Sequence, residues 1–164
     1  MNLRKGNVMI LLEMAIRFAN LFLAALVAGA TFGVWLGFNP SGLDSSTYVA
    51  LQQQGIRGMN IAMPVLGLAT IVATVAAGIL ARHDKSQLAL LAAAGCAFLA
   101  GGLITRFLNQ PINAIVMTWS PSAAPVQWMA LRDAWWRWHI ARMLLGLAGL
   151  SLLIFAGLIR GMKA

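Results

Sequence analysis

Four long apolar stretches constrain this chain more than any other feature of its sequence. A transmembrane helix needs about 20 mostly apolar residues, because the hydrocarbon core of a bilayer is about 30 Å thick. The stretches are 18–38, 61–81, 88–105 and 143–159. With 60% hydrophobic and 10% charged residues, the chain could not cover the surface of a soluble domain. We therefore expect an all-α protein, an integral membrane four-helix bundle that forms one domain over residues 1–164.

Lys and Arg residues indicate how the bundle is oriented, because cytoplasmic loops carry an excess of both. Four spans place both termini on one side of the membrane, together with the short turn at 81–87. The basic residues of this side are Arg4, Lys5, Arg17, Arg82, Lys85, Arg160 and Lys163. We therefore expect cytoplasmic termini in a bacterial inner (plasma) membrane. Two longer loops, 39–56 and 106–138, should lie on the non-cytoplasmic side.

The non-cytoplasmic side has an excess of positive charge. Its basic residues are Arg57, Arg106, Arg132, Arg137 and Arg142, against the acidic residues Asp44 and Asp133. This charge does not indicate nucleic acid, because it is divided between two faces of a membrane and forms no basic run. Membrane lipid is the expected surrounding. An ionisable side chain near hydrocarbon costs free energy, so its presence there favours a functional role.

The first longer loop contains the beginning of a further helix. It starts with the turn signal Asn-Pro-Ser-Gly, and Ser45 or Ser46 is a suitable helix cap before the run that follows. We expect that helix to break near Gly55 or Gly58 and then to continue into the second span.

The second longer loop combines prolines with five of the six tryptophans. The prolines are Pro111, Pro121 and Pro125. Tryptophan is enriched where bilayer meets water, so we expect this loop to lie along the membrane interface. For Trp128, Trp136 and Trp138, an aromatic belt at that interface is the simpler interpretation.

Three glycines recur at every fourth residue of the first span: Gly29, Gly33 and Gly37. This spacing places three bare patches on one helix face, where another backbone can approach closely. The sequence leaves two roles open for this face, namely helix packing inside the bundle and a homo-oligomer contact.

Polar residues recur at helical spacing in four segments, which places each set on one helix face. The sets are Thr31, Trp35 and Asn39; Gln53, Arg57 and Asn60; Arg106, Asn109 and Asn113; and Arg132, Trp135, His139 and Arg142. All four lie at the non-cytoplasmic ends of their spans, so they could line one pocket between helices. The expected walls are Trp35, Trp119 and Trp135. The expected polar groups are Arg57, Asn60, Arg106, Asn109, Asn113, His139 and Arg142.

Guanidinium groups on several inward faces would repel one another, because arginine stays protonated in proteins. An anion or a strong hydrogen-bond acceptor between them would remove that repulsion. The pocket should therefore favour a small aromatic ligand that is planar, electron-rich, and negatively charged or enolisable. The alternative is that these Arg and Asn side chains cap helix ends, extend to lipid headgroups or hydrogen-bond between helices.

His139 could serve as a general base, a proton shuttle, a haem ligand or a hydrogen-bonding core residue. Haem held by two histidines is disfavoured, because the other histidine, His83, lies in the cytoplasmic turn. A zinc site is disfavoured too, because no second ligand keeps the required spacing with His139. We find no P-loop, nucleophile triad or dinucleotide-binding fingerprint. We therefore expect no built-in cofactor and no metal.

Four ordered motifs run along the chain. They are Gly-Val-Trp-Leu-Gly-Phe-Asn-Pro-Ser (33–41), Gln-Gln-Gln-Gly-Ile-Arg-Gly-Met-Asn (52–60), Asn-Gln-Pro-Ile-Asn (109–113) and Trp-Arg-Trp-His-Ile-Ala-Arg (136–142). Together they resemble the anthrone-oxygenase-like family of small four-helix membrane proteins, most specifically in the Asn-x-Pro-x-Asn and Trp-x-x-x-His-x-x-Arg elements. The resemblance covers nearly the whole chain. It implies oxidation of an anthrone to an anthraquinone by molecular oxygen, without metal or flavin.

The chemistry of that reaction assigns expected roles to the pocket residues. An anthrone that loses a proton becomes an enolate, which can pass an electron to oxygen directly. The protein must supply a base, cations for the enolate oxygen and flat walls. We expect His139 to be the base. The expected enolate clamps are Arg57, Arg106 and Arg142; the stacking walls are Trp35, Trp119 and Trp135; and the orienting amides are Asn60, Asn109 and Asn113.

Two other functions fit the same sequence features. A quinone, quinol or haem could occupy the pocket of a membrane redox subunit. A small non-enzymatic membrane subunit could use its arginines to bind anionic lipid or an acidic segment of a partner protein.

Overall fold

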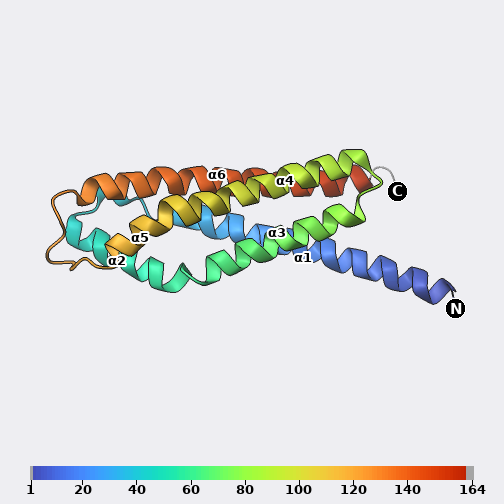
Figure 1. Ribbon diagram of the computed structural model, residues 1–164, viewed down its shortest axis with the longest axis horizontal. Helices are drawn as coiled ribbons and strands as arrows, with labels where there is room; N and C mark the ends of the chain where they lie inside the picture. Colours follow the sequence, from blue (N-terminus) through green and yellow to red (C-terminus); the bar gives the residue numbers. More distant parts are fainter. Residues whose placement is uncertain (1, 162–164) are drawn as a thin grey trace.

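The computed structural model describes residues 2–161, with side chains from residue 7 onward. Its elements are α1 (Asn2–Gly37), η1 (Pro40–Gly42), α2 (Ser45–Met59), α3 (Ala62–Leu80), α4 (Lys85–Ile104), η2 (Thr105–Asn109), α5 (Gln110–Val116) and α6 (Trp128–Gly161). They form an elongated helical bundle (Figure 1). The start of α1, the end of α6 and the α3–α4 turn lie at one end of the bundle, and α2 and α5 lie at the other.

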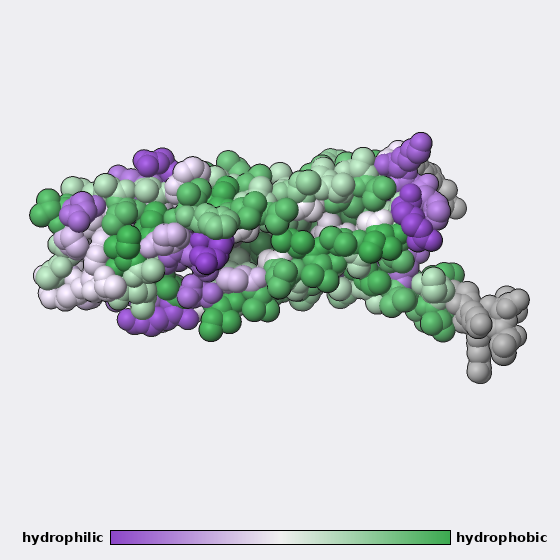
Figure 2. Space-filling view, in the orientation of Figure 1, coloured by the Kyte–Doolittle hydropathy of each residue, from purple (hydrophilic) through white to green (hydrophobic). Residues whose placement is uncertain are grey.

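Four helices confirm the expected spans. Within the described residues, the helices of α1, α3, α4 with its continuation, and α6 are long and apolar enough to cross a membrane. Hydrophobic residues cover the middle of the molecule, and hydrophilic residues gather on either side of it (Figure 2). The 19 residues of α3 span about 28 Å, which matches the hydrocarbon core. Because α1 and α6 have 36 and 34 residues, the bundle is longer than that core.

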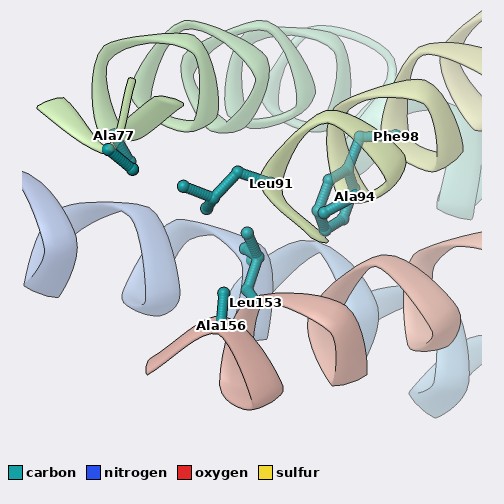
Figure 3. Close-up of a cluster of buried hydrophobic side chains, with 8 residues drawn as sticks. Ala77, Leu91, Ala94, Phe98, Leu153 and Ala156 are labelled. Atoms are coloured by element: carbon teal, nitrogen blue, oxygen red, sulfur yellow. The ribbon is translucent and has the colours of Figure 1, made fainter. Parts of the chain in front are cut away.

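A cluster of small and branched apolar side chains holds the spans together near the end where the termini lie. Its buried members are Ala24, Ala77, Ala81, Leu91, Ala94, Phe98, Leu153 and Ala156, from α1, α3, α4 and α6 (Figure 3). Lipid tails are as apolar as leucine, so close packing rather than water exclusion drives helix association in a bilayer. The alanines allow the helix backbones to approach and gain those contacts.

Polar contacts connect the helices at the same end of the bundle. Glu13 forms ion pairs with Arg17 at 2.9 Å and with Arg160 at 2.6 Å. Arg17 donates to Oε1 of Gln87 at 3.1 Å, and Gln87 donates to the carbonyl of Ala156 at 3.0 Å. Basic residues of α1 and α6 thus lie together, as the orientation argument requires. Which side is cytoplasmic stays a prediction. Of its basic residues, Lys163 lies outside the described residues, as do the side chains of Arg4 and Lys5.

The expected helix before the second span is present and starts at Ser45, but its capping residue and the exact position of its break differ from those expected. The cap of α2 is Asp44, which accepts a hydrogen bond from Thr47 N at 3.0 Å. This bond and those from the Ser46 and Thr47 hydroxyls hold the pKa of Asp44 well below its usual range. The helix continues through both glycines, and the break falls at Asn60. Its cause is Pro64, whose ring would clash with the carbonyl four residues earlier in a continuous helix.

The second longer loop is mostly helical, in agreement with the helical spacing of its polar residues at both ends. The helix of α4 continues through η2 and α5 to Val116, and α6 begins at Trp128, so 117–127 is the part without a regular helix. The segment η2 is a π-helix directly before Gln110 and Pro111. Because proline cannot donate the backbone bond that its position requires, one extra residue in the turn allows the chain to continue as a helix.

The glycines that pack inside the bundle are not those of the first-span face. A Cβ added at Gly29, Gly33 or Gly37 would meet no described atom from outside its own stretch of helix within 4 Å. The homo-oligomer contact of that face stays a prediction. By contrast, a Cβ on Gly146 would lie 3.8 Å from the Cα of Ala28, so this glycine marks a close approach of α6 to α1.

Gly149 is expected to be essential for the packing of α6 on α4. A Cβ added there would lie 2.8 Å from the ring of Phe98, which is buried. We expect Gly149→Ala to lower the free energy of unfolding by about 1–3 kcal/mol, because the ring must shift in a packed core. Gly157→Ala on the same helix meets open space and is the matched control. Reversible unfolding in mixed detergent micelles measures both, and equal stabilities would contradict this account.

Candidate functional site

A cavity of about 250 Å³ lies where α2 and α5 meet the ends of the spans. Its polar lining residues are Thr31, Gln52, Asn60, Thr105, Gln110, Asn113, Trp135, His139 and Arg142. Its apolar lining includes Val34, Phe38, Leu51, Ile56, Met59, Met63 and Pro64. We call it the Arg142 cavity. Because its lining includes the first turn of α3, it lies at the boundary between hydrocarbon and headgroups.

Arg142 is the cation of this cavity, and three neighbours hold it. It donates from Nε and Nη2 to Nδ1 of His139 at 3.3 and 3.0 Å. It donates from Nη1 to Oγ1 of Thr105 at 3.3 Å. Its Cζ lies 5.8 Å from the ring centroid of Trp135, within the range of a cation–π contact. These contacts leave one N–H on each terminal nitrogen, so the guanidinium can still bind an acceptor in the cavity.

These contacts fix the protonation pattern of His139. Arginine has no acceptor, so Nδ1 of His139 must accept and therefore carries no proton. The proton then lies on Nε2, which donates to the carbonyl of Thr31 at 3.1 Å. The ring has no exposed surface and stacks on Trp135 at 5.2 Å and on Trp136 at 5.4 Å. The imidazole is thus a neutral connector between Arg142 and α1.

Asn113 fixes the aromatic wall of the cavity. Its Oδ1 accepts from Nε1 of Trp135 at 2.8 Å and from Nε2 of Gln52 at 3.3 Å. One amide from α5 therefore holds a ring of α6 and a side chain of α2. Because the carbonyl oxygen is already used, its NH₂ group is the part that remains for a ligand.

Five of the expected site residues come together in the Arg142 cavity. They are Asn60, Asn113, Trp135, His139 and Arg142. Arg106 lies beside it and lines two adjoining hollows, which share Gln110 with the Arg142 cavity. The set on α6 keeps the spacing that the sequence predicted, because this helix is unbroken from Trp128 to Gly161. Its first member, Arg132, is buried instead over the ring of Trp128 and beside Asp133.

Four expected site residues lie elsewhere. Arg57 is exposed and donates to Gln53. Asn109 is fully buried and donates to the carbonyl of Trp135 at 3.0 Å. Trp35 is 40% exposed and stacks on Phe32, and Trp119 packs against the apolar cluster of Ile112, Val116 and Trp135 without lining the cavity itself. The expected pocket with three arginines and three tryptophan walls was therefore wrong, because the cavity lining includes one of each.

On α2 the displacement of Arg57 is an error of helix phase. On α2 the cavity face is Gln52, Ile56 and Met59, one residue earlier than the expected set. A shift of one residue turns a helix by about 100°, which exchanges an inward for an outward face. Gln53 is buried as expected but donates to the carbonyls of Val116 and Trp119 at 3.0 and 2.9 Å.

The π-helix of η2 causes the same kind of shift further along the chain. Its wider turn separates Asn109 from Asn113, so Gln110 and Asn113 line the cavity and Asn109 does not. Sequence analysis missed Gln52, Thr105 and Gln110 as lining residues. The signal that could have found Gln110 is the proline after it, since a proline within a helical run often coincides with a π turn or a kink.

The charge of the cavity limits what it can bind. Among its lining residues, Arg142 is the permanent cation and none is a carboxylate. The described residues contain no group of three His, Cys, Asp or Glu side chains suited to a metal ion. Both ring nitrogens of His139 are hydrogen-bonded, so the haem interpretation would require breaking one of these contacts. The arrangement suits a flat aromatic ligand with a negatively polarised oxygen.

We expect Asn113 and Trp135 to act as a coupled pair. Asn113→Leu leaves the indole N–H and the amide of Gln52 without their acceptor, which should cost about 1–3 kcal/mol of unfolding free energy. Trp135→Phe removes the indole donor. If the hydrogen bond holds the wall, the double variant should be less unstable than the sum of the two, by about 1 kcal/mol. Unfolding in detergent of the original protein, the two single variants and the double variant completes this double-mutant cycle. Strictly additive losses of stability would argue against the contact.

Comparison with known proteins gives one family. The family model described as anthrone oxygenase matches residues 54–152, which is more than half of the chain. The match runs from α2 to α6 and includes Asn60, Asn113, Trp135, His139 and Arg142. No curated protein matches the chain, and neither does any solved structure.

Proposed function

Because the chain belongs to the anthrone oxygenase family, we propose that the Arg142 cavity binds an enolisable polycyclic phenol or anthrone and promotes its oxidation by O₂ to a quinone. The single observation that carries this proposal is the cation of Arg142 in an aromatic-walled cavity with no lining carboxylate. With cytoplasmic termini, as the distribution of Lys and Arg predicts, this chemistry would take place toward the opposite face of the membrane.

The reaction needs charge stabilisation more than it needs a redox group. An anthrone that gives up a proton from its CH₂ to water becomes an enolate, that carbon passes electrons to O₂, and the resulting peroxide takes a proton back from water. A carbon–oxygen bond forms to give a hydroperoxide, which loses water and leaves the second carbonyl of the quinone. Each anthrone thus consumes one O₂ and releases one water. A donor fixed at the position of the developing negative charge lowers the barrier, more so in a site of low dielectric constant.

Arg142 is suited to stabilise that enolate. Its position is fixed by His139, Thr105 and Trp135, and a donor that is already oriented needs no rearrangement during the reaction. One N–H remains on each terminal nitrogen, so the group can bind two neighbouring oxygens of one ligand. A ketone with an adjacent hydroxyl, as in a hydroxylated anthrone, presents such a pair. The NH₂ group of Asn113 can orient a further oxygen.

His139 acts as a positioning residue in this proposal. An imidazole nitrogen has one lone pair, and that of Nδ1 already accepts from Arg142. The expectation from sequence that His139 is the base therefore requires Arg142 to move off Nδ1. In the resting geometry, the ring orients the guanidinium and links it to the carbonyl of Thr31. A quinol-binding redox subunit would use the same cavity, and steady O₂ consumption by the purified protein separates catalysis from binding alone.

The Arg142 cation should be required for turnover. We expect Arg142→Gln to reduce kcat/KM for a hydroxylated anthrone by about 100-fold or more, the scale seen when one oriented oxyanion donor is removed. Arg137→Gln is the matched control, because it removes the same charge from an exposed position of α6. Oxygen uptake by detergent-purified protein, with the thermal midpoint of each variant, is the measurement. Equal loss in the two variants, or no loss in either, would exclude this role.

Substitutions of His139 distinguish a positioning residue from a base. Glutamine can accept from Arg142 and donate to Thr31, but it cannot take up a proton at neutral pH, whereas leucine can do none of these. We expect His139→Gln to retain kcat within about tenfold of the original protein, with an unchanged pH profile, and His139→Leu to lose about 100-fold. If glutamine loses as much as leucine while both remain folded, His139 is the base.

A further inference from the structure

A second hollow adjoins the Arg142 cavity on the side toward the membrane interior. It has a volume of about 240 Å³ and lies between α3 and α4, with α1 and α6 behind it. Gly67, Leu68 and Ile71 form one wall, and Ala97, Gly101 and Gly102 form the other. We call it the lateral hollow. Figure 2 shows the surface hollowed where the hydrophilic part meets the hydrophobic middle.

The two spaces adjoin at the level of the cation, because six residues line both of them. The residues that line both are Thr31, Met63, Pro64, Thr105, Gln110 and Arg142. One side of Arg142 faces the amides and the aromatic wall, and the lateral hollow begins at the same side chain. A molecule whose oxygens bind Arg142 can therefore extend its carbon skeleton into the lateral hollow.

The sizes of the two spaces favour joint occupation by one ligand. Ligand pockets have volumes of about 300–1,000 Å³, and each of these spaces is smaller than that, with volumes of about 250 and 240 Å³. Together they fall within the range. Three wall residues of the lateral hollow are glycines, and at two of them, Gly67 and Gly102, an added Cβ would meet no atom from outside its own stretch of helix within 4 Å.

We propose that the substrate is amphipathic, with an oxygen-bearing aromatic end beside Arg142 and an apolar extension, an alkyl chain or further ring, in the lateral hollow between α3 and α4. This inference rests on the proposed function, since it specifies the substrate class of the same site. The extension lies at the depth of the acyl chains, so such a molecule reaches the site from within the bilayer. It therefore need not cross the charged headgroup layer.

A lipid acyl chain is the competing occupant of a hollow that faces the bilayer. An acyl chain would have no connection to the ligand at Arg142. The two occupants therefore differ in one measurable effect. If the substrate occupies the lateral hollow, filling that hollow weakens the binding of ligands that carry an extension. If an acyl chain occupies it, their affinity does not change.

The experiment compares two probes in phosphatidylcholine nanodiscs: 1,8-dihydroxyanthraquinone, and the same molecule with a hexyl chain on the ring edge away from the hydroxyls. Quenching of tryptophan fluorescence gives both Kd values without turnover. We expect Gly102→Leu and Gly67→Leu, which fill the hollow from opposite walls, to reduce the preference for the hexyl probe by about tenfold. Gly157→Leu, at an open position of α6 that lines neither space, should leave this preference unchanged. Partition of the hexyl probe into lipid is the same for every variant, so it cancels when the variants are compared.

A hexyl probe with a terminal diazirine gives an independent result on the unsubstituted protein. Its label should fall on α3 or α4 within the lateral hollow. A preference that is unchanged in both filling variants, or a label on other helices, would overturn the inference. Because binding is measured without turnover, chain selectivity without O₂ uptake would remove the proposed reaction and keep the amphipathic ligand. O₂ uptake without selectivity for the hexyl probe would keep the proposed reaction and overturn the amphipathic ligand.

Discussion

The hydrogen-bonded series from Arg142 through His139 to the carbonyl of Thr31 is the interaction on which the site depends. A cation at the edge of hydrocarbon is costly unless an acceptor and a polarisable surface compensate for lost water. The imidazole supplies the acceptor and Trp135 supplies the aromatic face. Because the series links α6 to α1, it also holds together two helices that line the cavity. The same contacts that lower the free-energy cost of burying the guanidinium also fix its orientation in the cavity.

Depth in the membrane determines what such a cation can do. Hydrocarbon on one side lowers the local dielectric constant, which strengthens the attraction between a guanidinium and an enolate. The lining contains no carboxylate that could neutralise it, and Asn113 contributes amide groups without charge. The hollow between α3 and α4 gives the site an apolar side as well. An oxidation that needs only an anionic intermediate and dissolved O₂ fits this combination.

Two prolines give the site its shape. Pro64 ends the continuous path of α2 into α3, and Pro111 follows the π-helix of η2. Each break changes the direction or phase of a helix at the level of Arg142. Gln110, which directly follows the π-helix, is a lining residue of the cavity.

The sequence by itself determined the four spans, because the length and hydropathy required to cross a bilayer are local properties of a segment. It also determined the series Trp135, His139 and Arg142, because α6 is one regular helix and its periodicity holds. Only the tertiary structure decided which faces of the other helices point inward. It removed Arg57, Asn109, Trp35 and Trp119 from the cavity. The physical reason is that helix phase after a π turn, and the rotation of a helix against its neighbours, depend on packing between segments distant in the chain.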